Sequence, residues 1–191
     1  MRDRIEQDIR DGIRVKEELL KSHVAVIEKA ARLIGDCLKK GNKLLFFGNG
    51  GSASDSQHLA AEFVGRYEKE RRALPAIALT TDTSILTAVA NDYGYDRVFE
   101  RQVEALGRPG DVAVGISTSG NSKSVILGIA KARELGLSTI VFSGRSGGEL
   151  KGKADLELIV PSQKTSRIQE THILVGHILC ERTDELLSGG A

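Results

Sequence analysis

The chain has 191 residues, of which 40% are hydrophobic and 28% are charged, and its formal net charge is +1. This balance is ordinary for one globular domain and lacks the basic excess typical of nucleic-acid or anionic-membrane partners, so neither partner is expected. Cys37 and Cys180 are far apart and lack C-x-x-C spacing, which argues against a disulfide framework and a thiolate metal site. No apolar stretch is long enough to span a membrane, and a cytoplasmic protein is expected.

Two helices are expected at the N-terminus. Isoleucines recur at helical spacing through Met1–Lys21, and a second helical pattern runs from His23 to Lys39. Ser22 is expected to cap the second helix, and Gly41 to end it in a left-handed conformation. The first helix has a narrow apolar stripe and a charged back, which favours packing against another subunit but also permits packing on its own domain. Residues 1–40 are therefore interpreted as an oligomerisation segment.

Five short apolar runs follow, mostly without polar alternation, as is typical of parallel strands buried on both faces. They are Lys43–Phe47, Ala76–Leu79, Asp111–Ser117, Thr139–Ser143 and Leu156–Val160. The helical segments between and after them are Ser52–Gly65, Thr83–Asn91, Arg97–Leu106, Ser122–Leu135, a short one near Glu149, and about Arg167–Leu187. The alternation predicts an α/β fold for residues 41–191: a doubly wound five-stranded parallel sheet (flavodoxin-like), flanked by helices, with an N-terminal helical extension.

Ligands of such sheets bind outside the carboxyl ends of the strands, near the topological switch point. The candidate loops are therefore Gly48–Ser54, Thr80–Thr83 and Ser117–Ser122. A short run of mixed charge, Lys69–Arg72, is instead interpreted as a solvated loop.

Two of these loops have the composition of anion sites. Gly48–Ser54 is rich in glycine, which lets backbone N–H groups approach an anion at a helix N-terminus, although an unliganded tight turn would use the same residues. In Ser117–Ser122, four hydroxyls occupy a position where a single helix cap would suffice. Hydroxyls together with free N–H groups suit a phosphate monoester without a lysine or a metal.

Two predicted helices carry further candidates. His58 and Glu62 are four residues apart and share one helix face, as paired ligands or a ligand and a base would. Gln169 and His177 lie a little over two turns apart and point in directions that differ by roughly 80°, so their spacing permits convergence without requiring it. Taken singly, each histidine is better explained as a partly buried or surface residue, and His172 is interpreted as structural because it faces another way.

Several segments carry a resemblance that spans essentially the whole chain: Gly48–Ser52, Ser56–Tyr67, Ala90–Tyr95, Gly115–Ser122, and Arg167–His172 together with His177. In these segments the sequence resembles the phosphoheptose isomerases of the sugar isomerase (SIS) domain superfamily. The Ser-Thr-Ser-Gly-Asn-Ser loop marks the superfamily only. His58, Glu62, Gln169 and His177 together are much more specific.

The resemblance implies one zinc ion per subunit, held by His58, Glu62, Gln169 and His177. An amide is a weak zinc ligand, so occupancy is expected to depend on conditions. It further implies that Glu62 is the general base and His177 the general acid or base. The implied substrate-binding residues are Asn49, Gly50, Gly51, Ser52, Glu62, Arg66, Asn91, Asp92, Ser117, Thr118, Ser119, Ser122 and Gln169.

The implied reaction converts D-sedoheptulose 7-phosphate to D-glycero-D-manno-heptose 7-phosphate through an enediol, as the first step toward ADP- or GDP-heptose for lipopolysaccharide core or surface glycans. The implied assembly is a homotetramer with active sites at subunit interfaces. One alternative is a non-enzymatic SIS protein that associates with the replication initiator, a class that lacks the carboxylate and the second histidine present here as Glu62 and His177. Another is a sugar-phosphate-sensing regulator, which the absence of an appended DNA-binding segment disfavours.

Overall fold

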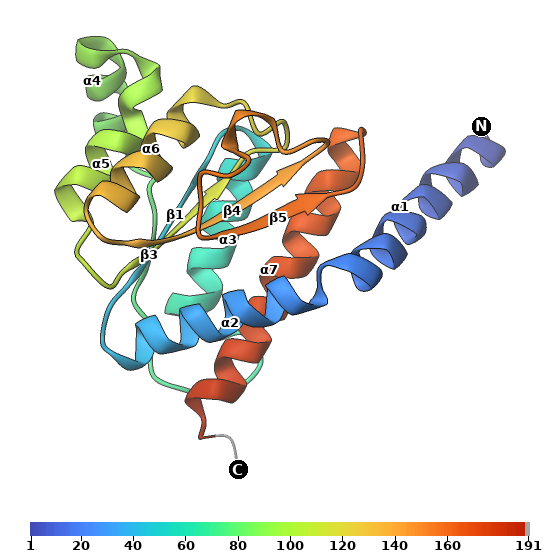
Figure 1. Cartoon of the computed structure of the whole chain (residues 1–191), viewed down its shortest axis with the longest axis horizontal. Coiled ribbons are helices and arrows are strands. Elements are labelled where there is room, and N and C mark those ends of the chain that lie inside the picture. Colours follow the sequence, from blue (N-terminus) through green and yellow to red (C-terminus); the bar gives the residue numbers. More distant parts are fainter. Residues whose placement is uncertain (190–191) are drawn as a thin grey trace.

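A computed structural model describes residues 1–189. Its centre is a sheet of five parallel strands in the order β2-β1-β3-β4-β5 (Figure 1). The strands are β1 (Leu44–Gly48), β2 (Ala76–Ala78), β3 (Val112–Ile116), β4 (Ser138–Gly144) and β5 (Leu156–Val160). From β1 the chain crosses to β2 on one side and later to β3 on the other, so the topological switch point lies between β1 and β3. The predicted doubly wound, flavodoxin-like α/β fold is confirmed.

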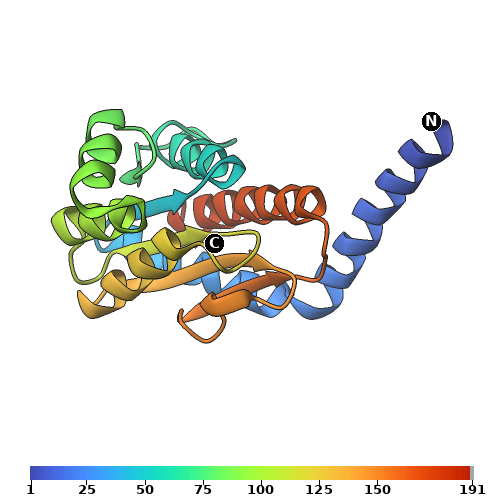
Figure 2. The ribbon, with the colours of Figure 1, turned by 90° about the horizontal axis from the view of Figure 1, so that it is seen from above.

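The helices form one layer on each face of this sheet (Figures 1 and 2). They are α1 (Arg2–Ser22), α2 (Val24–Lys39), α3 (Gly51–Val64), α4 (Thr83–Tyr93), α5 (Val98–Leu106), α6 (Lys123–Glu134) and α7 (Thr165–Leu187), with 3-10 turns η1 (Tyr95–Arg97) and η2 (Gly148–Leu150). Helices α2, α3 and α7 share a core cluster with one face of the sheet, and α5 and α6 share another with the opposite face. None of the helices within the described residues is both long and apolar enough to cross a membrane.

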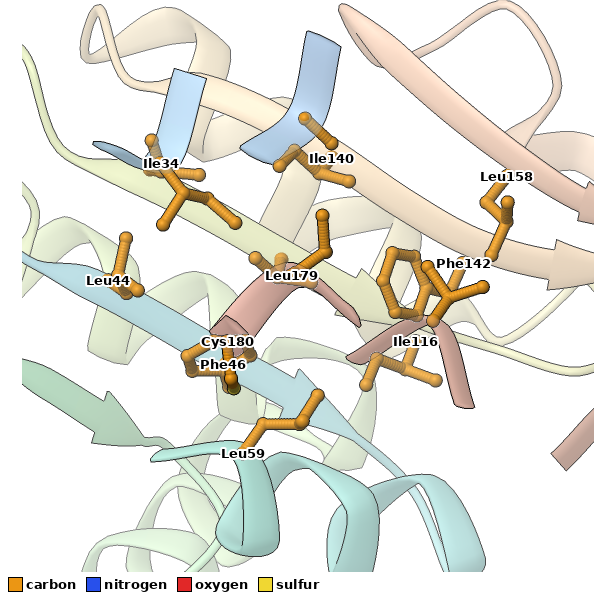
Figure 3. Close-up of a cluster of buried hydrophobic side chains, with 14 of the residues drawn as sticks. Ile34, Leu44, Phe46, Leu59, Ile116, Ile140, Phe142, Leu158, Leu179 and Cys180 are labelled. Atoms are coloured by element: carbon orange, nitrogen blue, oxygen red, sulfur yellow. The ribbon is translucent and has the colours of Figure 1, made fainter. Parts of the chain in front are cut away.

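Strand β1 shows why the apolar runs are continuous. Leu44 and Phe46 pack into the cluster with α2, α3 and α7, while Leu45 and Phe47 pack into the cluster with α5 and α6. Figure 3 shows the first cluster, in which Leu59 of α3 lies close to Phe46. Alternate side chains of a strand point to opposite faces, so a central strand covered on both sides must be apolar throughout.

Strand β2 departs from that expectation. It forms one edge of the sheet, and Ile77 is 38% exposed. The prediction that the apolar runs are buried on both faces is therefore wrong for this strand. Sequence pattern alone does not show which strand the topology places at an edge.

The junction between α1 and α2 also differs in part from the prediction. Ser22 does not cap α2; it is the last residue of α1, and its hydroxyl donates to the carbonyl of Glu18 at 2.7 Å. The bond holds the hydroxyl of Ser22 against the last turn of α1. The residue at the N-cap position is His23, without a side-chain cap bond. The end of α2 follows the prediction, because Gly41 has a φ of +80° and its N–H donates to the carbonyl of Leu38.

Helix α1 contacts its own domain from Asp8 onward, where the backbone carbonyl of Asp8 accepts a hydrogen bond from Arg167. Asp11, Val15 and Leu19 are buried there, whereas residues 1–10 are exposed. Figure 2 shows the N-terminal part of the helix projecting away from the body. The apolar side chain of Ile9, in this projecting part, is 59% exposed. Packing of this stripe on another subunit stays a prediction.

Candidate active site

The first glycine-rich loop follows β1 at the switch point. Gly50, with a φ of +56°, is the N-cap residue of α3, so the first N–H groups of that helix lie at the end of the strand. Asn49 is fixed at both ends of its amide: it donates to the hydroxyl of Ser124 at 2.9 Å and accepts from the hydroxyl of Tyr95 at 2.8 Å. Tyr95 was not singled out from the sequence, although it lies in one of the segments that carry the family resemblance.

The second loop follows β3, whose last residue Ile116 pairs with Gly48 of β1. The hydroxyl of Ser117 donates to that of Ser122 at 2.9 Å, and the hydroxyl of Ser119 accepts the N–H of Asn121 at 3.1 Å. These bonds shape the loop itself. Both loops lie at the carboxyl ends of neighbouring strands, so together they form one candidate site, which we call the anion loops (residues 48–52 and 117–122).

The second anion loop is supported from behind by η2. Gly120 has a φ of +70°, and a Cβ at this position would collide with the carbonyl of Gly147. The carbonyl of Gly120 accepts the N–H of Leu150, and the side chain of Asn121 accepts the N–H of Glu149 at 2.9 Å. The loop is therefore held at a fixed position by backbone contacts, with glycine required for the close approach.

Donors remain available in the second anion loop. Ser122 is the N-cap residue of α6 but makes no side-chain cap bond, and the hydroxyl of Thr118 has no hydrogen-bond partner in the part of the chain that is described. The first N–H groups of α6 have no partner within that helix, and the helix dipole adds partial positive charge. These groups can donate to the oxygens of a phosphate.

A cluster of three side chains lies between α3 and α7. On α3, Nε2 of His58 lies 3.1 Å from Oε1 of Glu62, and Nε2 of His177 on α7 lies 3.0 Å from Nε2 of His58. One ligand atom from each residue lies within 4.8 Å of the others, which is an arrangement able to hold a metal ion. Gly176 makes this convergence possible, because a Cβ there would come within 2.5 Å of Leu59 and push the helices apart. We call His58, Glu62 and His177 the helix-pair cluster.

Gln169 lies elsewhere on α7. Its amide packs directly over Gly51, where a Cβ would collide with it. Eight residues separate it from His177, or about 12 Å along a helix axis. Gln169 is thus beside the first anion loop, and within the described chain it makes no hydrogen bond to the helix-pair cluster. Its role as a fourth metal ligand stays a prediction.

The remaining predicted substrate residues differ in their exposure to solvent. Ser52 is buried in the first turn of α3. Asn91 and Asp92 are exposed near the end of α4 and bond to each other at 2.8 Å. Arg66 follows α3, with its guanidinium 3.5 Å from the exposed carboxylate of Glu70. The substrate roles of these residues stay predictions.

The run Lys69–Arg72 contains a residue that the sequence analysis misjudged. Arg71 is not solvated: its side chain is 9% exposed and its Nε lies 2.6 Å from a carboxylate oxygen of Asp184, which is 3% exposed. The interpretation as a wholly solvated loop is therefore wrong. Local composition could not reveal this pair, because its partners are 113 residues apart in the sequence.

His172 has the structural role expected of it. It is buried on α7, and its Nε2 lies 2.9 Å from the carbonyl of Ser143 on β4. Burial lowers the pKa of this imidazole to about 4. Burial likewise raises the pKa of the Cys37 thiol to about 11, so that thiol is inert as expected.

The chain matches known proteins over nearly its whole length. A model of the SIS domain family matches residues 9–144. The phosphoheptose isomerase of Aquifex aeolicus is 56% identical to this chain over 98% of each of the two chains. The chain belongs to the phosphoheptose isomerase family. The resemblance noted in the sequence is thereby confirmed over nearly its whole length.

Solved structures of the phosphoheptose isomerase family show the same fold. The phosphoheptose isomerase GmhA from Neisseria gonorrhoeae superposes with a TM-score of 0.89 at 47% identity, covering 96% of this chain and 98% of that one. A phosphoheptose isomerase from Francisella tularensis gives a TM-score of 0.93 at 38% identity, covering 96% and 97%. Family membership therefore extends from the anion loops to the helix that carries His177.

Proposed function

We propose that this chain is an aldose–ketose isomerase that converts D-sedoheptulose 7-phosphate to D-glycero-D-manno-heptose 7-phosphate, the first step toward ADP- or GDP-heptose. The observation that carries the proposal is the helix-pair cluster, a carboxylate and two imidazoles on α3 and α7, of which α3 begins at the first anion loop. Relatives that match nearly the whole chain are phosphoheptose isomerases. The replication-initiator adaptor and the sugar-phosphate-sensing regulator are not favoured.

The phosphate is held by the anion loops. Hydroxyls of Ser117–Ser122 and N–H groups at the starts of α3 and α6 donate to its oxygens. The reacting carbons are at the opposite end of the sugar, so this remote binding energy positions C1 and C2 against the helix-pair cluster. Asn49, Ser52, Asn91, Asp92, Arg66 and Gln169 are proposed to contact the sugar or its phosphate.

The reaction moves one proton between C1 and C2. The carboxylate of Glu62 takes a proton from C1 while a ring N–H of His177 donates one to the carbonyl oxygen on C2, which gives the enediol. Glu62 then returns its proton to C2, and His177 removes the proton from the oxygen on C1, which leaves the aldehyde. A positioned carboxylate and an imidazole are suited to these transfers.

The donor set of the helix-pair cluster fits zinc, because two imidazole nitrogens and a carboxylate oxygen already converge. We propose that His58, Glu62 and His177 hold it, with Gln169 as the fourth ligand. When bound, the ion would withdraw electron density from the substrate oxygens and stabilise negative charge on the enediolate. A carboxylate has two oxygens, so one of them on Glu62 remains free to accept the proton.

We also propose a homotetramer that completes the active site and works in the cytoplasm. A groove of about 620 Å³ lies between α2 and α7, lined by apolar side chains that include Ile27, Ala31 and Leu186. Together with the exposed stripe of α1, this surface suits a second copy of the chain. The side chain of His58 is 46% exposed in the single chain, which leaves room for a partner to cover the site. Light scattering should report a tetramer, and a stable monomer would contradict this part.

A turnover assay with sedoheptulose 7-phosphate tests the function. The wild-type protein should produce the aldose, and Glu62→Gln should lose turnover by about 10²–10⁴-fold while substrate binding is largely retained. Full activity in Glu62→Gln would overturn the assignment of the base. A wild-type protein that is inert both with and without zinc would favour the adaptor.

A further inference from the structure

A buried ion pair joins the two helices of the helix-pair cluster. Arg71 lies in the segment between α3 and β2, and Asp184 lies on α7. The Nε of Arg71 donates to Oδ1 of Asp184 at 2.6 Å, and the two side chains are 9% and 3% exposed. An ion pair this deeply buried is costly to break, because removing one partner leaves the other charge without compensation.

The same guanidinium also ends α3. Its Nη2 donates to the carbonyl of Glu62 at 2.9 Å, and its Nη1 donates to the carbonyls of Phe63 at 2.9 Å and Gly65 at 3.2 Å. The last carbonyls of a helix have no intrahelical partner, and a cation there also complements the helix dipole. One side chain therefore fixes the final turn of α3 and attaches it to α7. We call Arg71 and Asp184 the clasp.

Both ends of the clasp are close to the reacting groups along the chain. Glu62, whose carboxylate belongs to the helix-pair cluster, supplies one of the carbonyls that Arg71 holds. Asp184 lies about two turns beyond His177 and, at roughly 100° per residue, on nearly the same face of α7. The clasp therefore bridges the same two helix faces as the cluster, at the end nearer the C-terminus of α3.

The chemistry requires such a constraint. Glu62 and His177 come from helices far apart in sequence, and their separation depends only on how α3 packs against α7. A misplacement of about 1 Å in a catalytic group can reduce the rate by about 100-fold. Apolar packing at Leu59 and Gly176 sets how closely the helices approach, and the clasp adds a directional, charge-assisted hydrogen bond between the two sides.

We propose that Arg71 and Asp184 are positioning residues for the isomerisation: they fix Glu62 against His177 without touching the substrate. This rests on the proposed function. Since the anion loops lie at the strand ends and do not include the clasp, loss of the clasp should impair the chemical step and leave phosphate binding intact.

The test compares Asp184→Asn, which preserves shape but removes the charge, with Arg71→Lys, which preserves the charge but removes the planar fork. Lys43→Gln is the matched control, because it breaks another partly buried ion pair, Lys43–Asp111. This pair lies at the N-terminal ends of β1 and β3, away from the anion loops at their carboxyl ends. In both clasp variants kcat per folded protein should fall about 10–100-fold, with KM changed by less than about threefold. Lys43→Gln should lose thermal stability and keep both constants.

Two further measurements test whether the clasp positions the catalytic groups. Because the two residues act as one unit, the double variant should be no slower than the slower single variant, whereas multiplied losses would contradict the clasp. Zinc titration against a chromophoric chelator should show roughly tenfold weaker binding in Asp184→Asn and no change in Lys43→Gln, since the clasp fixes the proposed ligands Glu62 and His177 relative to each other. Unchanged kcat and zinc affinity in both clasp variants would overturn the proposal. An inert wild type that still shows the zinc difference would overturn the function and keep the clasp.

Discussion

The anion loops and the helix-pair cluster are built in different ways. The anion loops consist of backbone and short hydroxyl side chains at the ends of β1 and β3, and Ser117 is only 3% exposed. The helix-pair cluster consists of long side chains on two helices, with the side chain of His58 46% exposed. The sheet fixes the first region, and side-chain packing with one ion pair fixes the second. In the proposed mechanism binding and chemistry therefore depend on different parts of the molecule, and substitutions should separate them.

The largest effect is expected in the helix-pair cluster. His177→Gln removes the proposed acid while keeping a hydrogen-bonding side chain, so kcat should fall by about 10²–10⁴-fold. KM should change by less than about threefold, since the anion loops are untouched. Steady-state kinetics with sedoheptulose 7-phosphate measure both constants. A rise in KM at constant kcat would place His177 with substrate binding and contradict its role as the acid.

A smaller effect is expected where α7 joins the sheet. His172 attaches that helix to β4 through Ser143, and burial lowers its pKa from 6.5 to about 4. Between these values the unfolded chain binds a proton that the folded chain does not. Stability is therefore retained above pH 6.5 and lost as the pH falls toward 4, by about 3 kcal/mol in all.

Urea unfolding of the wild type and of His172→Gln between pH 7 and pH 4 measures this contribution. The difference between the two unfolding free energies should shrink by about 3 kcal/mol over that range, because glutamine does not titrate. A difference that stays constant with pH would show that His172 is not held neutral by burial. The contact of His172 with Ser143 would then not depend on a neutral imidazole at the junction of α7 and the sheet.

The smallest effect is expected in the anion loops. Thr118→Val removes one hydroxyl donor and keeps the side-chain shape, so KM should rise about tenfold, as expected for one hydrogen bond to a charged group. kcat should change by less than about threefold. Thr87→Val is the control, because its hydroxyl bonds within α4 to the carbonyl of Thr83, and it should leave both constants unchanged. A loss of kcat at constant KM in Thr118→Val would contradict the assignment.

The sequence predicted the anion loops more completely than the helix-pair cluster, for a physical reason. Glycines and hydroxyls that follow an apolar run belong to one local segment, and parallel strands bring such segments together at one edge of the sheet. The edge position of β2 and the N-cap at His23 were missed, because both depend on neighbours that pattern does not reveal.

The sequence predicted only part of the helix-pair cluster. His58 and Glu62 follow from their spacing on one helix, but the approach of His177 to His58 joins residues 119 apart and depends on the packing of α3 against α7. The burial of Arg71 was missed for the same reason, because its partner Asp184 is 113 residues away on the last helix. Contacts of this kind become visible only once the fold places the helices.

A double variant with one substitution in each region is the most direct test of their independence. The double variant Thr118→Val/His177→Gln should show the KM of the first substitution and the kcat of the second, because the two substitutions act at opposite ends of the proposed substrate and independent effects add as free energies. kcat and KM for sedoheptulose 7-phosphate, measured side by side in the wild type, both single variants and the double variant, decide it. Agreement within about threefold is the predicted result. A double variant whose kcat or KM departs from these values by tenfold or more would contradict the separation of binding from chemistry.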